Sequence, residues 1–460
     1  MPACLVVVLA TSWVVAQQGL PTGAGELVKF TIPERDARGV LIWQLMGDHA
    51  KLRTDGKMEV DKLTVSTFKS SGVDWTFTTP TCVFNRETRE GVSESEVKMS
   101  NKNTEITGDG FHWLANESRF IIRSNVTVSI EGGISKSVLL TTPAGATNKS
   151  STRICSNLLD FDYSTNRIAS FEGKVVAVDP QLTLCCKTMK VFFADKNNEV
   201  LRVEAFADVH MFHEGKEGIG EKAVFTRETG LVMLMGSGPM LRDEKGNWMR
   251  SRGDGIIYDI GKKTMRVDKP TLEIQSGGMT NAVVSTAPKL WAGPPTPQPA
   301  SKVVSQPAAP APAPLAGTTS KPFTKIDSEV MDFVDYTTNR VATFEGNVVA
   351  EDPQLTLRCK TMKVIFSNNN NEVLRVEAYT DVHMLHAGSE AIGEKAVFTR
   401  ESGIIVLSGP KPMLRDEKGN WIRSRGEGIT YDTVKKLMHV DKPTSEILTG
   451  GGNDPMTPAR

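Results

Sequence analysis

The sequence predicts an all-β protein, and three observations support this prediction. Short segments alternate apolar and polar residues with a period of two, which places Leu355 and Leu357 on one face of an extended strand. Turn-forming groups such as Asp352-Pro353 punctuate these segments at spacings of roughly 8–12 residues. The chain shows no convincing amphipathic helix. This combination is typical of a β-sandwich, a jelly roll or a barrel.

The predicted strands follow one another along the chain. In the N-terminal third, the turns at Thr54-Asp-Gly-Lys and Ser70-Ser-Gly each separate two strands. Near the C-terminus, residues 354–360, 362–366 and 374–378 read as strands, and the asparagine run 368–371 forms a turn between the last two. Every described segment therefore fits the same architecture of short strands joined by tight turns.

Composition narrows the function classes. The 460 residues carry 54 Lys+Arg against 54 Asp+Glu, and 39% are hydrophobic. A length of roughly 150 residues per domain suggests about three domains. The formal charge of +0 excludes the basic footprint of a sequence-independent nucleic-acid binder, so no nucleic-acid partner is expected.

The N-terminal residues 1–16 contain the apolar stretch LVVVLATSWVVA. Its length of about 12 residues suits the core of a cleaved signal peptide, and a short membrane anchor is the alternative. Either interpretation takes the chain out of the cytoplasm. We expect a periplasmic location, with an inner-membrane anchor through the N-terminus as the second possibility.

The chain contains an internal duplication. Residues 162–275 align without a gap on residues 335–448, and most aligned positions are identical. We expect repeat 1 to span residues 153–278 and repeat 2 to span residues 325–450. The Pro/Ala-rich residues 287–322 form a linker between them, either looping out or spacing the repeats apart. The N-terminal third, residues 26–140, is not an obvious third copy.

A string of strand phrases runs through each repeat. In repeat 2 it includes Phe344-Glu-Gly-Asn-Val-Val-Ala, Leu355-Thr-Leu-Arg-Cys-Lys, Gly393-Glu-Lys-Ala-Val-Phe and Gly428-Ile-Thr-Tyr-Asp. With these phrases the repeat resembles the OstA-like family, typified by the lipopolysaccharide-transport protein LptA. The N-terminal third is similar to LptC, through Ala50-Lys-Leu-Arg-Thr-Asp-Gly and related phrases.

The resemblance implies three open β-jelly-roll units in tandem that stack edge to edge. It also implies a hydrophobic trough for the acyl chains of lipopolysaccharide. The implied partners are lipopolysaccharide, an inner-membrane ABC exporter, an outer-membrane assembly protein and further copies of the chain. No cofactor is expected. Period-two alternation assigns these apolar side chains to the inward face: Leu182, Leu184, Met189, Val191, Phe193 and Val203 in repeat 1, and Leu355, Leu357, Met362, Val364, Phe366 and Val376 in repeat 2.

Enzymatic signatures are weak. His210-Met-Phe-His213 and His383-Met-Leu-His386 have metal-ligand spacing on a helix, but on a strand the two histidines of each motif point to opposite faces. No phosphate-binding loop or nucleophile motif is present. We expect neither catalysis nor a metal site.

Three function classes stay open. The first is a lipid-carrying bridge, the second a self-assembling β scaffold of the cell envelope with an ordinary core, and the third a histidine-dependent hydrolase. The alternation alone does not separate a lipid-lined trough from a closed core. The sequence also leaves a Cys82–Cys155 disulfide undecided.

Overall fold

The computed structural model describes residues 25–69, 72–132, 151–180, 182–195, 198–244, 246–274, 323–335, 340–353, 355–368, 372–386, 388–435 and 437–446. The predicted signal peptide or anchor and the Pro/Ala-rich linker lie outside these residues. The chain divides into two compact units, and the division falls inside repeat 1. The first unit comprises Met1–His213 and Lys222–Gly230, and the second comprises Glu214–Glu221 and Leu231–Arg460.

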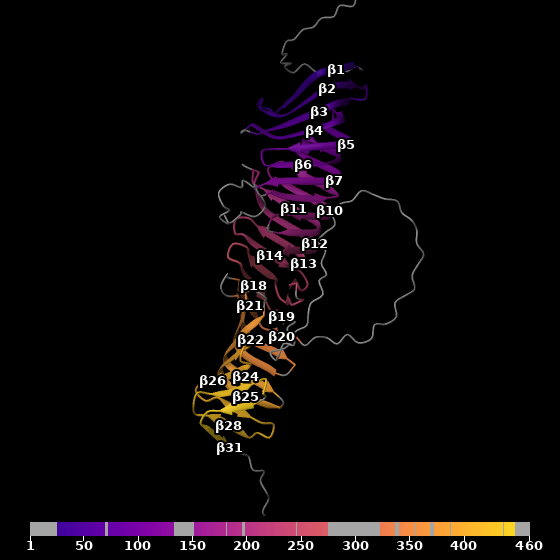
Figure 1. The fold of residues 1–460 in the computed structure, drawn as a ribbon. Coiled ribbons are helices and arrows are strands. Elements are labelled where there is room, and N and C mark those ends of the chain that lie inside the picture. The colour runs from indigo at the N-terminus through magenta and orange to yellow at the C-terminus, as the bar shows by residue number, and fades with distance from the viewer. Residues whose placement is uncertain are drawn as a thin grey trace, which may run out of the picture. The chain divides into compact units, whose positions relative to one another are not determined.

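The first unit is built from antiparallel strands that follow one another in chain order (Figure 1). Its strands are β1 (Gly25–Arg35), β2 (Leu41–Leu52), β3 (Lys57–Lys69), β4 (Gly72–Asn85), β5 (Glu90–Ser100), β6 (Thr104–Leu114), β7 (Arg119–Glu131), β8 (Ser151–Ser156), β9 (Leu158–Asp162), β10 (Ile168–Val178), β11 (Thr183–Phe193) and β12 (Val200–His213). Among the described residues, the one helical element is the 3-10 turn η1 (Ala115–Glu117).

The second unit uses the same antiparallel pairing with shorter strands at its two ends. Strand β13 (Lys216–Thr226) divides between the two units. The strands that follow are β14 (Leu231–Met235), β15 (Met240–Arg242), β16 (Trp248–Ser251), β17 (Ile256–Asp259), β18 (Thr264–Asp268), β19 (Pro270–Ile274), β20 (Thr324–Asp327), β21 (Val330–Asp335), β22 (Arg340–Asp352), β23 (Leu355–Phe366), β24 (Val373–His386), β25 (Ser389–Thr399), β26 (Ile404–Ser408), β27 (Met413–Arg415), β28 (Trp421–Ser424), β29 (Ile429–Asp432), β30 (Leu437–Val440) and β31 (Pro443–Glu446).

The long strands bend near their middle, so each contributes to two faces that we call the first arm and the second arm. In β10, residues 176–178 pair with β8 in the first arm, whereas residues 168–172 pair with β9 in the second arm. In β3, residues 63–69 lie in the first arm and residues 57–61 in the second. In the second unit β22 pairs in the same way with β20 and β21. The all-β prediction is therefore correct, and the architecture is that of open jelly-roll units.

The bend is produced by irregular backbone that interrupts the strand register. In the first unit Lys62, Asn125 and Lys174 have φ values of 50°, 53° and 50°, and in the second unit Asn347 and Asp381 have φ values of 46° and 53°. The pairing register shifts next to Asn125, Lys174, Asn347 and Asp381, as it does at a β-bulge. A left-handed residue turns the strand sharply, so one strand serves both arms.

Ion pairs lie on the outer side of the bend. Lys187 Nζ is 2.6 Å from Asp208 Oδ2, and the equivalent Lys360 Nζ is 2.6 Å from Asp381 Oδ2. The hydrogen bond and the charge of Lys360 hold the pKa of Asp381 below its usual value. Because these ion pairs are exposed to solvent, they contribute little to the free energy of unfolding. They are compatible with the bulged backbone beside them.

One glycine in each repeat is required by a close backbone approach. Gly428, which opens the phrase Gly-Ile-Thr-Tyr-Asp, has φ +145°, and a Cβ there would lie 2.3 Å from the carbonyl oxygen of Leu407. In repeat 1 the equivalent Gly255 would place its Cβ 2.5 Å from the oxygen of Leu234. No side chain fits at either position, so the turn depends on glycine.

The repeats join edge to edge through main-chain pairing. In the first unit β7 pairs with β8 and β9, which begin repeat 1. In the second unit β18 and β19, which end repeat 1, pair with β21 and β20, which begin repeat 2. Ile274 lies directly opposite Thr324, so the ends of the intervening segment meet side by side. The two repeats therefore need no spacer between them.

We predict that replacing residues 275–323 by a short Asn-Gly-based turn leaves the fold intact. The free energy of unfolding should rise by up to about 2 kcal/mol, because closing a loop of a few residues costs less entropy than closing one of roughly 50. Urea unfolding followed by circular dichroism measures the change. A Gly/Ser segment of the native length is the control and should leave stability unchanged. A marked loss of stability in the shortened chain would contradict the observed pairing.

Candidate functional site

Eleven of the twelve residues predicted to face inward lie on strands, and Leu182 lies just before β11. Leu184, Met189, Val191, Phe193, Val203, Leu357, Met362, Val364 and Val376 are 0–8% exposed, and Leu182, Leu355 and Phe366 are half-buried. On the opposite face Arg358, Lys360 and Lys363 are exposed, and Thr356 is half-buried. Val191 pairs with Val203, and the equivalent Val364 pairs with Val376. The two repeats thus present the same apolar set between their arms.

Aromatic side chains from the N-terminal third fill the space between the two arms of the first unit. Phe77 of the first arm meets Trp113 and Phe120 of the second arm, with ring centroids 5.1 and 4.9 Å apart. Trp43 meets Trp113 at 5.3 Å. The sequence analysis did not single out these residues, although Trp75 and Phe77, like Phe111 and Trp113, alternate with the period of a strand.

The interior of the N-terminal third continues into repeat 1. Trp75 on β4 packs edge-on against Phe161 on β9, with centroids 5.0 Å apart. Phe161 in turn lies 6.2 Å from Phe193, one of the predicted inward residues. Trp113 Nε1 donates a hydrogen bond of 3.0 Å to the hydroxyl of Tyr163, which is also in repeat 1. The first unit therefore has one interior, shared by two sequence domains.

The interior of the second unit is built in the same way. Phe333 lies 6.3 Å from Phe366, edge to face, which repeats the contact between Phe161 and Phe193. At the junction between the repeats, buried Val267 of β18 pairs with buried Met331 of β21. The apolar layer thus runs without interruption from the end of repeat 1 into repeat 2.

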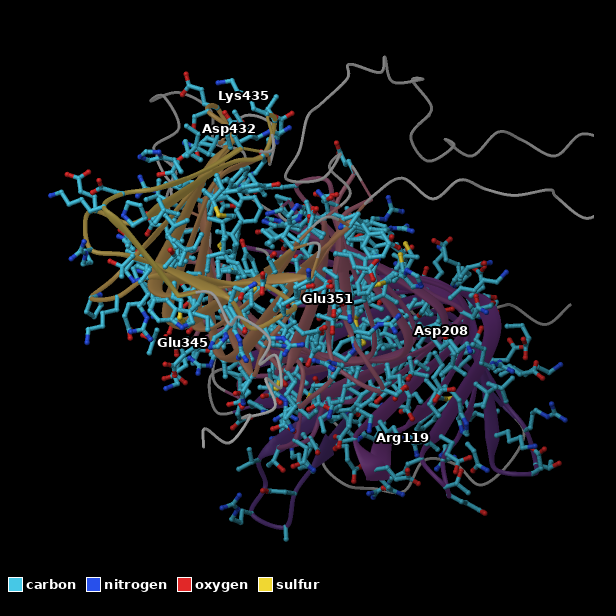
Figure 2. All side chains as sticks on the ribbon, turned by 90° about the horizontal axis from the view of Figure 1, so that it is seen from below. Arg119, Asp208, Glu345, Glu351, Asp432 and Lys435 are labelled. Atoms are coloured by element: carbon cyan, nitrogen blue, oxygen red, sulfur yellow. The ribbon has the colours of Figure 1, made fainter. Side chains whose placement is uncertain are left out.

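Side chains close this interior to water. Figure 2 shows the side chains filling the space among the strands, with Arg119 and Asp208 of the first unit labelled. Among the described residues the buried charged side chains are Arg167 and Glu204, and Glu204 forms an ion pair with Arg202. A guest molecule enters such an interior only if the arms move apart.

The histidine motifs lie on strands, as expected. In β24, His383 Nδ1 is 2.7 Å from Glu390 Oε1, and His386 Nε2 is 3.1 Å from the hydroxyl of Tyr431. In β12, His210 stacks on Phe212. In the part of the chain that the structure describes, no three His, Cys, Asp or Glu side chains gather in a way that could hold a metal ion.

Bent strands whose halves form two facing arms define a protein of the open β-jelly-roll class. Both repeats match the family model described as LptA/(LptD N-terminal domain) LPS transport protein, over residues 153–264 and 325–437. The matched ranges make up a little under half of the chain and exclude the N-terminal third. They point to a function related to lipopolysaccharide transport. None of the curated proteins matches the chain.

Within the described ranges, no helix has the length and apolar character needed to cross a bilayer.

The cysteines that the structure describes are all free thiols. Cys82 and Cys155 form no disulfide, which answers the question that the sequence left open. Burial raises the pKa of Cys82 and of Cys186 to about 12, and that of Cys359 to about 11. Cys185, next to Cys186 on the strand, is half-buried. The buried thiols stay protonated at neutral pH and are inert.

We predict that iodoacetamide at pH 8 labels Cys82, Cys186 and Cys359 at least about 100-fold more slowly in the native chain than in urea, because the thiolate is the reactive form. Peptide mapping by mass spectrometry follows each site separately. Half-buried Cys185 is the internal control and should react before its neighbour Cys186. Equal rates in native and unfolded protein would contradict the closed interior.

Proposed function

We propose that the chain is a non-enzymatic periplasmic bridge that carries lipopolysaccharide from the inner membrane towards the outer membrane. The observation that carries the proposal is the apolar layer between the two arms, which continues from one sequence domain into the next within each unit. Such a layer offers a path along which acyl chains slide without leaving an apolar environment. The match of both repeats to a lipopolysaccharide-transport family supports the choice of cargo.

The energetic problem that a bridge solves is large. Each methylene group exposed to water costs about 0.8 kcal/mol, so one acyl chain costs on the order of 10 kcal/mol to hydrate. Residues such as Leu357, Met362 and Val364 replace the membrane interior for that chain. Because they are closed to solvent, passage requires the arms to part, and the acyl chain then occupies the space that opens.

The proposal extends to the N-terminal third and to the partners. We infer that the N-terminal third serves as an LptC-like unit that receives lipid from an inner-membrane ABC exporter. Within the described residues β1 pairs only with β2, and Val28 of this edge strand is 61% exposed. In the second unit, β30 pairs only with β29 within the described residues, and its Leu437 is 63% exposed. Unpaired strand edges accept further strands, which supports an outer-membrane assembly protein or another copy of the chain as neighbour.

A self-assembling β scaffold is the second candidate. The observation that favours it is the dense packing of the interior, since Phe77, Trp113 and Phe120 are fully buried and fill their space as in an ordinary core. A scaffold would use the strand edges alone and carry no cargo. The two candidates differ in whether lipid ever reaches the inward face.

We predict that a photo-crosslinking side chain at Leu357 or Val364 captures lipopolysaccharide in cells, because both positions face the interior. The same side chain at Arg358 or Lys363 should capture none, because these positions face solvent on the same strand. Crosslinked species are detected on gels with an antibody against the lipid. Equal capture from both faces would exclude an inward path.

Mass spectrometry of lipid that co-purifies with the native chain separates the two candidates. Lipid A species support the bridge. The absence of lipid from folded protein that forms filaments, together with no capture at Leu357, supports the scaffold.

A further inference from the structure

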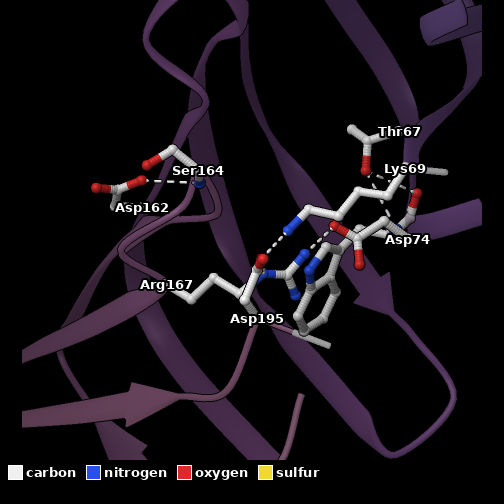
Figure 3. A network of polar contacts seen from close by, with 8 residues as sticks. Thr67, Lys69, Asp74, Asp162, Ser164, Arg167 and Asp195 are labelled. Atoms are coloured by element: carbon white, nitrogen blue, oxygen red, sulfur yellow. Dashed lines mark hydrogen bonds and ion pairs between the residues drawn. The ribbon is translucent and has the colours of Figure 1, made fainter. Parts of the chain in front are cut away.

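Four charged residues tie the two arms of the first unit together at their free ends (Figure 3). Lys69 and Asp74 lie in the first arm, at the end of β3 and near the start of β4. Arg167 and Asp195 lie in the second arm, just before β10 and just after β11. Arg167 donates from Nη2 to Asp74, and Lys69 bonds to Asp195. We call these four residues the latch.

The latch joins parts of the chain that are far apart in sequence. Lys69 and Asp74 belong to the N-terminal third, whereas Arg167 and Asp195 belong to repeat 1. Arg167 Nε also lies 3.4 Å from Asp195 Oδ1, so Asp195 contacts both cations. Because the pairs join the tip of one arm to the tip of the other, they close the mouth of the interior, meaning the opening between the free ends of the arms.

The latch leaves hydrogen-bonding capacity unused inside the protein. The side chain of Arg167 is 1% exposed, yet among the described residues its Nη1 has no hydrogen-bond partner. Nε1 of Trp75, the residue next to Asp74, is also buried and has no partner in the part of the chain that the structure describes. Both groups are donors, and a buried donor without an acceptor is costly. The site is therefore suited to an additional oxygen acceptor.

Repeat 2 shows that the fold does not require this arrangement. Arg340, the equivalent of Arg167, donates from Nε and Nη2 to Asp335 at 2.8 and 2.7 Å, in a two-pronged pair within its own repeat. In repeat 1 the equivalent Asp162 instead accepts a hydrogen bond from the backbone of Ser164. Asn368 occupies the place of Asp195. The arginine at this position therefore pairs with an aspartate of its own repeat in repeat 2 (Arg340), whereas in repeat 1 (Arg167) it pairs with Asp74 across the mouth.

The position of the latch determines which part of a bound lipid it would contact. An amphiphile whose chains lie between the arms keeps its polar head at the mouth. Trp75, which follows Asp74 in the first arm, contacts Phe161 of the second arm, so parting the arms here breaks both the ion pairs and this ring contact. A headgroup that replaces the lost carboxylates offsets the cost of separating buried charges.

We propose that the latch is a recognition site for a phosphate group on the head of the transported lipid, an inference that rests on the proposed function. The phosphate displaces Asp74 from Arg167 and Asp195 from Lys69, and it accepts hydrogen bonds from the spare Arg167 Nη1 and from Trp75 Nε1. The site has two cations and unused donors, which suit the several oxygens of a phosphate. It closes the mouth at rest and opens for an anionic headgroup.

The test compares purified lipopolysaccharide with the same lipopolysaccharide after removal of its phosphates, both bound to the full chain. The wild type should bind the phosphorylated form about tenfold more tightly, as expected for added charge-assisted hydrogen bonds. Arg167→Met should abolish this preference, and Arg167→Lys should restore part of it. Arg340→Met is the matched control, because its arginine is satisfied within repeat 2, and it should keep the full preference.

Two further variants separate recognition from a structural ion pair. Asp74→Asn removes the competing carboxylate and should strengthen the preference for the phosphorylated form, in the direction opposite to Arg167→Met. Lys69→Met removes the less buried cation and should weaken the preference by about threefold. It keeps the test informative if Arg167→Met fails to fold. An unchanged preference in Lys69→Met, or in folded Arg167→Met, overturns the proposal.

Inorganic phosphate distinguishes a lipid headgroup from a free anion. If phosphate alone at millimolar concentration competes as well as the lipid does, the latch is an ion site and headgroup recognition is wrong. The outcome for the latch is also separable from the outcome for the bridge. Capture of lipid at Leu357 with no phosphate preference removes only the latch proposal, whereas no capture at any inward position removes the bridge itself.

Discussion

The requirement that each long strand serve two arms governs the rest of this structure. A strand that bends at Lys174 or Asn347 places one half in each arm, so consecutive strands pair along both arms at once. The bend interrupts the regular hydrogen bonding between strands and requires a residue with left-handed backbone. Such a residue is present in several of the long strands. The apolar interior exists because the two halves of each bent strand face each other, and the mouth exists because the main chain of these strands connects the arms at the bend and not at their free ends.

The same constraint explains how a duplicated unit was accommodated. Repeat 1 ends with β18 in one arm and β19 in the other, and repeat 2 begins with β21 and β20. Strand β18 pairs with β21, and β19 pairs with β20, so both arms continue across the junction. Pairing therefore continues the arms and the interior together, with Val267 beside Met331 on the inside and Arg266 beside Asp332 on the outside. An edge that ends a unit is automatically a site at which another unit of the same kind is added.

The fold was largely readable from the sequence, but the partners of individual side chains were not. Period-two alternation places nine of the twelve inward residues at buried positions. The prediction of two strands over residues 354–360 and 362–366 is wrong, because they form the single bent strand β23, and the alternation changes phase between Cys359 and Met362 where that strand bends. The ion pair of Arg167 with Asp74 could not be predicted from the sequence. The local sequence around Arg340 is nearly identical, yet Arg340 pairs with Asp335, which precedes it by five residues. The choice depends on Asp74, 93 residues away, whose approach only the folded arms define.

Differences between the two near-identical repeats are informative where their surroundings differ. Thr264 of β18 lies opposite Val334 and is covered, whereas the equivalent position of β30 holds Leu437, which is 63% exposed. Burying the Leu437 side chain under a further strand pair would contribute about 1.5–3 kcal/mol if the burial were complete. A leucine at this edge, where the paired copy has threonine, therefore favours an edge that is covered in the working assembly over one that faces water.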